Sequence, residues 1–373
     1  MTHTYVIAEA GVNHNGSLDR ALDLIDAATQ CGADAVKFQS FRPDELVSAR
    51  ARKAPYQEQT TGEAEGQLEM LRKLQLSAED HRALLRRCRD RNIDFLSTPF
   101  DEHSLQMLVE DLGVQRLKLG SGDLTHGPLL FAAARTSLPL ILSTGMATQK
   151  EIDDALGVVA FCWTMSEGEA STESFARARD SVAGRTALEE RLVLLQCTTE
   201  YPAPFDEVNL RVMASFREHY GVNVGLSDHT PGIAIPLAAV ALGATVVEKH
   251  FTLDKSLPGP DHRASLDPTE LESMVEGIRA VEAALGTAEK TVGQAEARNR
   301  VPARRSLIAA QPIRPGEPFT ARNLGAKRPG DGISPMRYWD VIGQTAAREF
   351  VVDEPISVEG IPTESHEHSK EDS

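Results

Sequence analysis

Short apolar runs rich in β-branched residues alternate with longer stretches that carry apolar residues at helical spacing along residues 5–286. The longer stretches include 18–32 and 77–92, and several end at Gly or Asn, as helices often do. The last one covers residues 268–286. The short runs predict eight strands, at residues 5–11, 35–40, 94–99, 116–122, 139–145, 192–198, 223–229 and 245–251.

Eight strands that alternate with helices predict an α/β fold, a closed (β/α)8 TIM barrel, because eight parallel strands close this architecture. The alternative is a doubly wound open sheet, but no G-x-G-x-x-G sequence follows the first strand. Two insertions interrupt the alternation. Residues 41–76 have the character of a long active-site loop, and residues 161–190 that of a peripheral helical elaboration.

The alternation of apolar runs and helical stretches ends after Gly286. We assign residues 1–287 to the barrel and the polar residues 288–303 to a linker. Residues 304–361, with short β-like runs and many Pro and Gly, predict a small irregular domain. Residues 362–373 lack apolar side chains and predict a disordered tail.

The charge and composition of the chain argue against several classes of protein. The net charge of −16 argues against a nucleic-acid partner, which requires clustered Lys and Arg. No apolar run approaches the roughly 20 residues needed to span a membrane, and the first residues show no signal peptide. The four cysteines are scattered, as in a reduced protein. We therefore expect a cytoplasmic protein with no membrane association.

Polar side chains gather where the predicted strands end, which is where barrels of this kind carry their chemistry. Three ionisable groups in a row, Glu248, Lys249 and His250, end the last strand. Burying unpaired charge is costly, so we expect these groups to reach the barrel mouth, where substrate and metal would satisfy their charges.

Two lysines and a Gly-Ser-Gly sequence predict an anion site. Lys37 and Lys118 lie on strands 2 and 4, and Ser121 lies between Gly120 and Gly122. Two ammonium groups and free backbone N–H groups suit a phosphate or a carboxylate. A single strand-end lysine could instead form a Schiff base, as in an aldolase.

His229 and His250 end adjacent strands, so their imidazoles can converge. Two neutral imidazoles with no cysteine suit a divalent transition metal with open positions for substrate. Glu9 and Glu248 are candidates for proton transfer or for orienting water. Either carboxylate could instead neutralise a lysine.

A series of motifs along almost the whole chain resembles the sialic acid synthases, which make nonulosonic acids from phosphoenolpyruvate and a mannosamine-type sugar. The motifs are IAEAGVNHNGSLDRA, GADAVKFQSF, FLSTPFD, LKLGSGDL, STGMAT, CTTEYPAPF, GLSDHTPG, EKHFTLDKSLPGPDHRASL and KRPGDGISP. The resemblance implies a TIM barrel followed by an antifreeze-like domain (a SAF domain of β-clip type). It also implies a domain-swapped homodimer, in which each small domain covers the barrel mouth of its partner.

The resemblance also implies roles for single residues. His229 and His250 match the metal ligands, with Mn²⁺ expected and Mg²⁺ or Co²⁺ as alternatives. Glu9, Glu248 and Lys118 match catalytic positions. The phosphoenolpyruvate contacts match Lys37, Lys118, Ser121, Ser143 and Ser227. The sugar contacts match Gln39, Tyr201, Asp261 and Arg328, the last delivered to the partner's sugar. The 41–76 loop aligns poorly with the family, so no ligand is transferred from it.

The implied reaction is a condensation with C–O cleavage. Carbon 3 of phosphoenolpyruvate attacks the open-chain aldehyde, water adds at carbon 2, and phosphate leaves. The sequence PGPDHRAS resembles both the N-acetylneuraminate and the legionaminate synthases. Of these two, we expect N-acetylmannosamine as the sugar and N-acetylneuraminate as the product. The alternative is 2,4-diacetamido-2,4,6-trideoxymannose, which gives N,N'-diacetyllegionaminate. More distant alternatives are a Schiff-base pyruvate aldolase and a non-catalytic sugar-binding protein.

Overall fold

The computed structural model describes residues 3–62, 66–165 and 168–361. The chain divides into two compact units, residues 1–286 and 287–373. The tail predicted to be disordered, residues 362–373, lies outside the described residues.

The first unit is a parallel barrel of eight strands, as predicted. Its sheet has the order β3-β2-β1-β8-β7-β6-β5-β4, and its two ends, β3 and β4, lie beside each other. The strands are β1 (Tyr5–Gly11), β2 (Ala35–Ser40), β3 (Asp94–Pro99), β4 (Leu117–Leu119), β5 (Leu140–Ser143), β6 (Leu192–Cys197), β7 (Asn223–Asp228) and β8 (Val246–His250).

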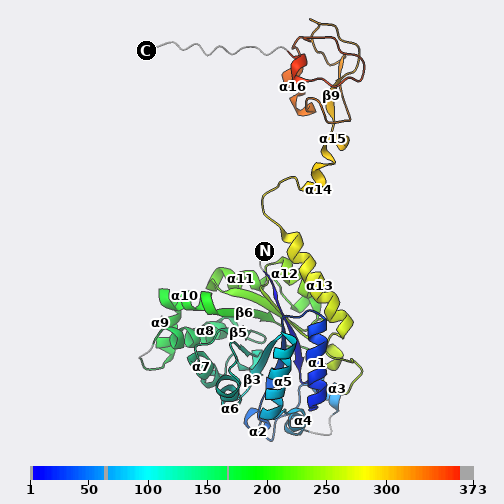
Figure 1. The fold of residues 1–373 in the computed structure, drawn as a ribbon. Helices are drawn as coiled ribbons and strands as arrows, with labels where there is room; N and C mark the ends of the chain where they lie inside the picture. Colours follow the sequence, from blue (N-terminus) through cyan, green and yellow to red (C-terminus); the bar gives the residue numbers. More distant parts are fainter. Residues whose placement is uncertain (1–2, 63–65, 166–167, 362–373) are drawn as a thin grey trace, which may run out of the picture. The chain divides into compact units, whose positions relative to one another are not determined.

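Helices surround this sheet (Figure 1). They are α1 (Leu18–Gln30), α5 (Ala78–Arg91), α6 (Glu102–Gln106), which continues as a π-helix (Met107–Asp111), α7 (Gly127–Arg135), α8 (Gln149–Thr164), α11 (Val212–Tyr220), α12 (Ala234–Ala241) and α13 (Pro268–Leu285). Their ends follow ordinary capping rules. Ser77 and Asp80 form a capping box at the start of α5, and Asn92 ends that helix in the left-handed conformation, at φ 56°.

Two apolar layers hold the barrel together. The outer layer packs the strands against the helices, through residues such as Val6, Leu24 and Leu84. A smaller inner layer fills the barrel with Ile7, Ala35, Leu96, Ile141, Leu195 and Val246. Because side chains alternate between the two faces of a strand, polar residues that follow an inner-layer residue by two positions also point inward. This alternation brings Glu9, Lys37 and Glu248 to one end of the barrel.

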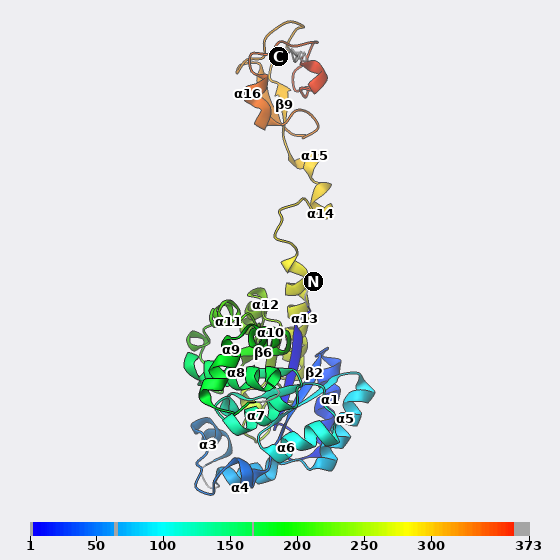
Figure 2. The same cartoon turned by 90° about the vertical axis from the view of Figure 1, so that its left-hand side faces the viewer.

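The two insertions form extra helices. The first, after β2, contains α2 (Pro43–Leu46), α3 (Pro55–Thr61) and α4 (Gln67–Leu74). Figures 1 and 2 show these helices at the end of the barrel opposite the start of β1. The second contains α9 (Thr172–Asp180) and α10 (Val182–Arg191), which pack against α8. Phe175 of α9 packs on Phe161 of α8 with 5.2 Å between ring centroids.

The second unit has a core of its own, around Phe319 and Phe350. It contains two short helices, α14 (Gln294–Ala297) and α15 (Arg300–Ala303), the antiparallel strands β9 (Ser306–Ala309) and β10 (Leu324–Lys327), and α16 (Tyr338–Val341). Single 3-10 turns complete the structure at Ser121–Asp123, Phe205–Glu207, His262–Ala264, Pro335–Arg337 and Val358–Gly360. Across the described ranges, every helix is too short or too polar to cross a bilayer.

Candidate active site

A cavity of about 290 Å³ opens at the carboxyl ends of the barrel strands. Twelve of the thirteen residues predicted for the site line it, namely Glu9, Lys37, Gln39, Lys118, Ser121, Ser143, Tyr201, Ser227, His229, Glu248, His250 and Asp261. The thirteenth, Arg328, follows β10 in the second unit. The predicted residues of the barrel therefore share a single cavity.

Lys37, Lys118, Glu9 and Glu248 form a buried charge cluster in this cavity, each at most 4% exposed. Lys37 Nζ lies 2.8 Å from Glu9 Oε2 and 3.8 Å from Glu248 Oε2. Lys118 Nζ lies 3.5 Å from Glu248 Oε1, which also accepts a 3.0 Å hydrogen bond from Ser227 Oγ. Two positive and two negative charges thus compensate one another where an unpaired charge would be costly.

The two carboxyl groups of this cluster differ in proton affinity. Burial raises the pKa of Glu9 to about 7, against the opposing effect of Lys37. Burial also disfavours the ionised form of Glu248, but Lys118 and Lys37 outweigh it and hold the pKa of Glu248 well below its usual range. The cluster therefore pairs an ionised carboxylate with a carboxyl group able to exchange a proton near neutral pH.

The two lysines are also distinct. Burial lowers the pKa of Lys118. Burial has the same effect on Lys37, but Glu248 and Glu9 outweigh it, so the pKa of Lys37 is raised. Lys37 Nζ donates to Thr98 Oγ1 at 3.1 Å, and Lys118 Nζ donates to the carbonyl oxygen of Leu119 at 3.1 Å. Lys37 is therefore a fixed positive charge that is already paired with carboxylates.

Hydroxyl groups beside the lysines suit an anion. Ser143 Oγ and Thr199 Oγ1 are buried and have no hydrogen-bond partner within the described residues. Gly145 N donates to Ser121 Oγ at 2.9 Å. A Cβ atom on Gly145 would lie 2.2 Å from Thr199 Oγ1 and 2.8 Å from Ser121 Oγ. A side chain at position 145 would therefore displace these two hydroxyl groups, which line the cavity.

The two histidines converge as predicted, with 5.5 Å between their ring centroids. His229 Nδ1 lies 2.7 Å from the carbonyl oxygen of Thr198, to which it can only donate, so Nε2 is left to act as a ligand atom. His250 Nδ1 is buried without a hydrogen-bond partner in the described part of the chain, 4.0 Å from Asp261 Oδ2. Burial, and then the neighbouring His229, lower the pKa of His250 well below its ordinary value.

These properties fit a divalent transition metal. A ligand imidazole must be neutral, and the lowered pKa keeps His250 neutral. Burial disfavours the charged form of His229 as well, but Cys197 outweighs it and raises the pKa of His229, so this imidazole would release a proton on binding a metal. A hydrogen bond from the other ring nitrogen orients a ligand histidine, and the bond from His229 Nδ1 to the Thr198 carbonyl oxygen is of this kind. The Tyr201 ring lies 4.1 Å from the His229 ring, and both line the cavity. The histidine pair and its surroundings could therefore hold a metal beside the charge cluster.

The expectation that Lys249 reaches the barrel mouth is wrong. Glu248 and His250 line the cavity, but Lys249 does not. Side chains alternate along a strand, so Lys249 points to the opposite face, where its Nζ lies 2.5 Å from Asp228 Oδ2 and also donates to the carbonyl oxygen of Thr230. Asp228 and Thr230 flank His229, so the buried ion pair supports the segment that presents this histidine.

Five further polar residues line the cavity without a predicted ligand role, namely Gln57, Gln67, Thr98, Cys197 and Thr199. Thr98 and Cys197 lie at the ends of β3 and β6 and Thr199 follows β6, which was the available signal, whereas Gln57 and Gln67 belong to the insertion. Cys197 Sγ lies 3.9 Å from His229 Nδ1. The reasoning also missed an apolar side of the cavity, formed by residues in and around the 41–76 loop.

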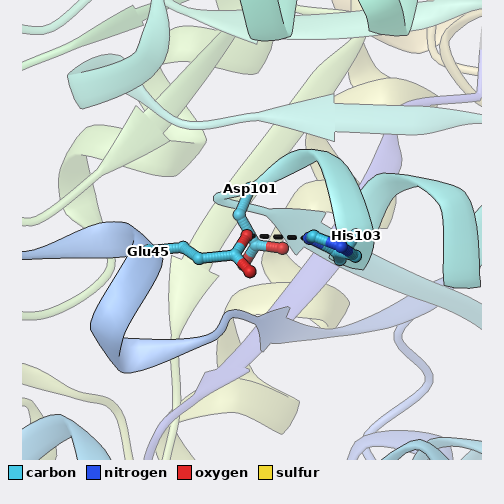
Figure 3. A group of neighbouring side chains, drawn as sticks. All are labelled: Glu45, Asp101 and His103. Atoms are coloured by element: carbon cyan, nitrogen blue, oxygen red, sulfur yellow. Dashed lines mark hydrogen bonds and ion pairs between the residues drawn. The ribbon is translucent and has the colours of Figure 1, made fainter.

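A second group of potential metal ligands lies outside the cavity lining, at Glu45, Asp101 and His103 (Figure 3). Asp101 already accepts hydrogen bonds from the Arg42 and Ser104 N–H groups, both at 2.7 Å, and from Ser104 Oγ. Glu45 and His103 are exposed and form a 2.9 Å ion pair. Asp101 therefore caps the start of α6, and the ion pair between Glu45 and His103 joins α2 to α6 on the surface.

Comparison with known proteins places the chain in a family. The model of the NeuB family matches residues 24–290, and the SAF domain model matches residues 304–361. The chain belongs to the NeuB family. It is therefore an enzyme, a synthase of this family, in which a TIM barrel precedes a SAF domain. The predicted resemblance and fold are confirmed.

Three similar proteins share most of this NeuB-family chain. The N,N'-diacetyllegionaminic acid synthase of Campylobacter jejuni is 46% identical over 95% of this chain and 99% of that protein. The N,N'-diacetyllegionaminic acid synthase of Legionella pneumophila is 43% identical over 91% and 89%. The solved structure of N-acetylneuraminic acid synthetase from Leptospira borgpetersenii is 31% identical, covers 80% of this chain and 90% of that one, and has a TM-score of 0.63.

Proposed function

We propose that this enzyme condenses phosphoenolpyruvate with 2,4-diacetamido-2,4,6-trideoxymannose and releases N,N'-diacetyllegionaminate and phosphate. The observation that supports a phosphoenolpyruvate condensation is a single cavity, which is lined by two buried lysines, two buried glutamates and a histidine pair. The choice of sugar rests on the two legionaminate synthases, at 46% and 43% identity, against 31% for the N-acetylneuraminic acid synthetase. These values favour the alternative sugar over N-acetylmannosamine.

Phosphoenolpyruvate would bind between Lys37, Lys118 and the Gly120–Gly122 segment. Lys118 and the unpartnered hydroxyl of Ser143, which both line the cavity, would contact its phosphate and carboxylate groups. Ser121 and Ser227 line the same region. Lysine ammonium groups held in a buried site stabilise charge that develops on the leaving phosphate more strongly than they would in water.

His229 and His250 would hold a divalent metal, with Mn²⁺ proposed and Mg²⁺ or Co²⁺ as alternatives. Bound there, such an ion supplies Lewis-acid polarisation of the sugar aldehyde. The chain orients the ligand atoms through the hydrogen bond between His229 and Thr198 and keeps His250 neutral by burial. Gln39, Tyr201 and Asp261 line the cavity near the histidines and are proposed to position the sugar.

Carbon 3 of phosphoenolpyruvate forms a C–C bond to the sugar aldehyde carbon, whose oxygen takes a proton to become a hydroxyl. Water adds to carbon 2 and releases one proton, which balances the proton taken by the new hydroxyl. The C–O bond to phosphate then breaks, carbon 2 becomes a carbonyl, and the second water proton leaves with the phosphate. Glu9, with a pKa of about 7, is able to give and take protons in these steps. Glu248 stays ionised and favours positive charge developing at carbon 2.

The C-terminal unit is proposed to complete the site of a second copy in a domain-swapped homodimer. Arg328, which follows β10, would contact the partner's sugar. Arg328→Ala and His250→Ala chains should each be inactive alone, and mixed dimers of the two should regain activity, because one site would then contain both residues. Absence of complementation, or a monomeric mass in solution, would contradict this arrangement.

The function is tested by phosphate release from phosphoenolpyruvate in the presence of Mn²⁺. Release with 2,4-diacetamido-2,4,6-trideoxymannose should exceed release with N-acetylmannosamine, and EDTA should abolish it. The metal site is tested separately by the Mn²⁺ electron paramagnetic resonance signal, which should report weaker binding by His250→Ala. Preference for N-acetylmannosamine would move the product to N-acetylneuraminate, and no release with either sugar would refute the proposed reaction.

A further inference from the structure

An apolar wall forms one side of the active-site cavity. Eight residues make up this wall, five buried and three partly buried, and all eight line the cavity. They are Val12, Phe41, Leu46, Val47, Met70, Leu71, Leu74 and Phe100. They form a cluster of their own, separate from the outer and inner layers of the barrel core. The wall is therefore more than an extension of the barrel core.

Helices α2 and α4 supply half of this wall, and Val47 directly follows α2. Met70 and Leu74 lie one turn apart on α4, so both can face the same surface. Helix α2 packs against α4. Val12, Phe41 and Phe100 follow β1, β2 and β3, and Phe41 and Phe100 contact each other edge to face at 6.3 Å. The wall thus spans the cavity from the strand ends to the insertion.

The position of the wall indicates which part of the sugar it meets. The reacting aldehyde must lie near the histidines and the charge cluster, because the polar groups that can act on it are there. The distal carbons of the open-chain sugar must extend away from that centre. Among the described residues that line the cavity, the lysine and arginine side chains are Lys37 and Lys118, both in the charge cluster. Their positive charge therefore lies beside the reacting centre and not along the wall.

We infer that the wall formed by α2, α4 and the ends of β1–β3 binds the distal end of the sugar and selects a 6-deoxy sugar over one with a hydroxyl at carbon 6. The inference rests on the proposed function. A methyl group at carbon 6 gains from burial against the alkyl side chains. A hydroxyl group packed against these eight side chains loses its water and receives no hydrogen bond from them. Gln57 of α3 and Gln67 of α4 also line the cavity, so the selection requires carbon 6 to pack on the alkyl groups and not beside these amides.

The expected selectivity is moderate. A hydrophobic pocket distinguishes analogues that differ by one small group by about 10- to 200-fold in kcat/KM. We therefore expect 2-acetamido-2,6-dideoxymannose to be used about 10- to 200-fold better than N-acetylmannosamine. These two sugars differ only at carbon 6, so their comparison isolates the wall from any effect of the 4-acetamido group.

The test measures kcat/KM for the two sugars, with the diacetamido sugar as a third, on the full-length enzyme. Met70→Gln places an amide in the wall with little change in length and should lower the preference for the 6-deoxy sugar about tenfold. Met70→Leu, the matched apolar control, should leave the preference within about twofold. Leu74→Asn and Leu74→Met form a second pair with the same expectation. A ratio measured on one preparation does not depend on the folded fraction.

The possible results distinguish failure of the inference about the wall from failure of the proposed reaction. Equal use of the 6-deoxy and 6-hydroxy sugars by the wild type would overturn the inference and leave the proposed condensation standing. The inference would also be overturned if Met70→Leu changed the preference as much as Met70→Gln. If no sugar supported phosphate release, the proposed function would fail, and the inference with it.

Discussion

The buried ion pair between Lys249 and Asp228 gives a sharp prediction about the stability of the barrel. Lys249 is 1% exposed and Asp228 is 2% exposed, and Nζ lies 2.5 Å from Oδ2. The Asp228 carboxylate also accepts hydrogen bonds from Thr230 N at 3.1 Å and Thr230 Oγ1 at 3.0 Å. Lys249→Met preserves much of the side-chain volume but removes the positive charge.

Removing one partner of a buried ion pair leaves an uncompensated charge and costs about 3–5 kcal/mol. A domain is stable by about 5–15 kcal/mol, so Lys249→Met should remove a large share of the stability of the barrel. At about 2–4 °C per kcal/mol, the Tm should fall by on the order of 10 °C. Circular dichroism during thermal and urea unfolding measures both quantities.

The double variant Asp228→Asn/Lys249→Met removes both charges while Asn can still accept the hydrogen bonds from Thr230. We expect it to be more stable than Lys249→Met alone, because its amide carries no charge that needs a partner. If the effects of the two substitutions simply added, or if Lys249→Met cost less than about 1 kcal/mol, the ion pair would not be the support described here.

Further predictions concern single positions in the barrel. Burial raises the pKa of Asp123 from 3.8 to about 6. The protonated Asp123 side chain is therefore favoured by folding, and its contribution to the free energy of unfolding is fully present below pH 3.8 and is lost as the pH rises through 6. The loss amounts to about 3 kcal/mol by pH 8. Asp123→Asn should accordingly raise the Tm at pH 8 and change it little at pH 4, and an equal gain at both values would contradict the assignment. Gly145→Ala should weaken phosphoenolpyruvate binding about tenfold in titration calorimetry, because its Cβ would displace the Thr199 and Ser121 hydroxyl groups and the loss of one hydrogen bond to a charged ligand is worth about tenfold in affinity; unchanged affinity would remove this glycine from the ligand site. Asn92 ends α5 at φ 56°, so Asn92→Gly should retain stability and Asn92→Val should lose about 1–2 kcal/mol, and equal urea midpoints for the two variants would refute this.

Much of the barrel could be predicted because its signals are local. Six of the eight predicted strands agree with the structure to within one residue at each end. Strands β4 and β5 are shorter than predicted. After Leu119 the chain turns into the 3-10 turn Ser121–Asp123, which takes the Gly-Ser-Gly segment out of the sheet. Ser121 of this segment lines the active-site cavity and does not extend the hydrogen-bonded ladder of the sheet.

The site was predictable only where strand geometry determines it. Lys37, Glu9, His229 and His250 lie at strand ends, so the closure of the barrel brings them together. Strict alternation along β8 would have separated Lys249 from Glu248 and His250. Sequence patterns offered no comparable rule for the apolar wall. It depends on how α2 and α4 fold back over the strand ends, and this packing is tertiary.

The most direct test of the proposed condensation uses phosphoenolpyruvate that carries ¹⁸O in the bridge between carbon 2 and phosphorus, with 2,4-diacetamido-2,4,6-trideoxymannose as the acceptor. The ³¹P spectrum of the released phosphate reports where the bridge breaks. C–O cleavage predicts that the phosphate retains the ¹⁸O label and that N,N'-diacetyllegionaminate forms in equal amount. Unlabelled phosphate, or phosphate released without this product, would contradict the proposed reaction.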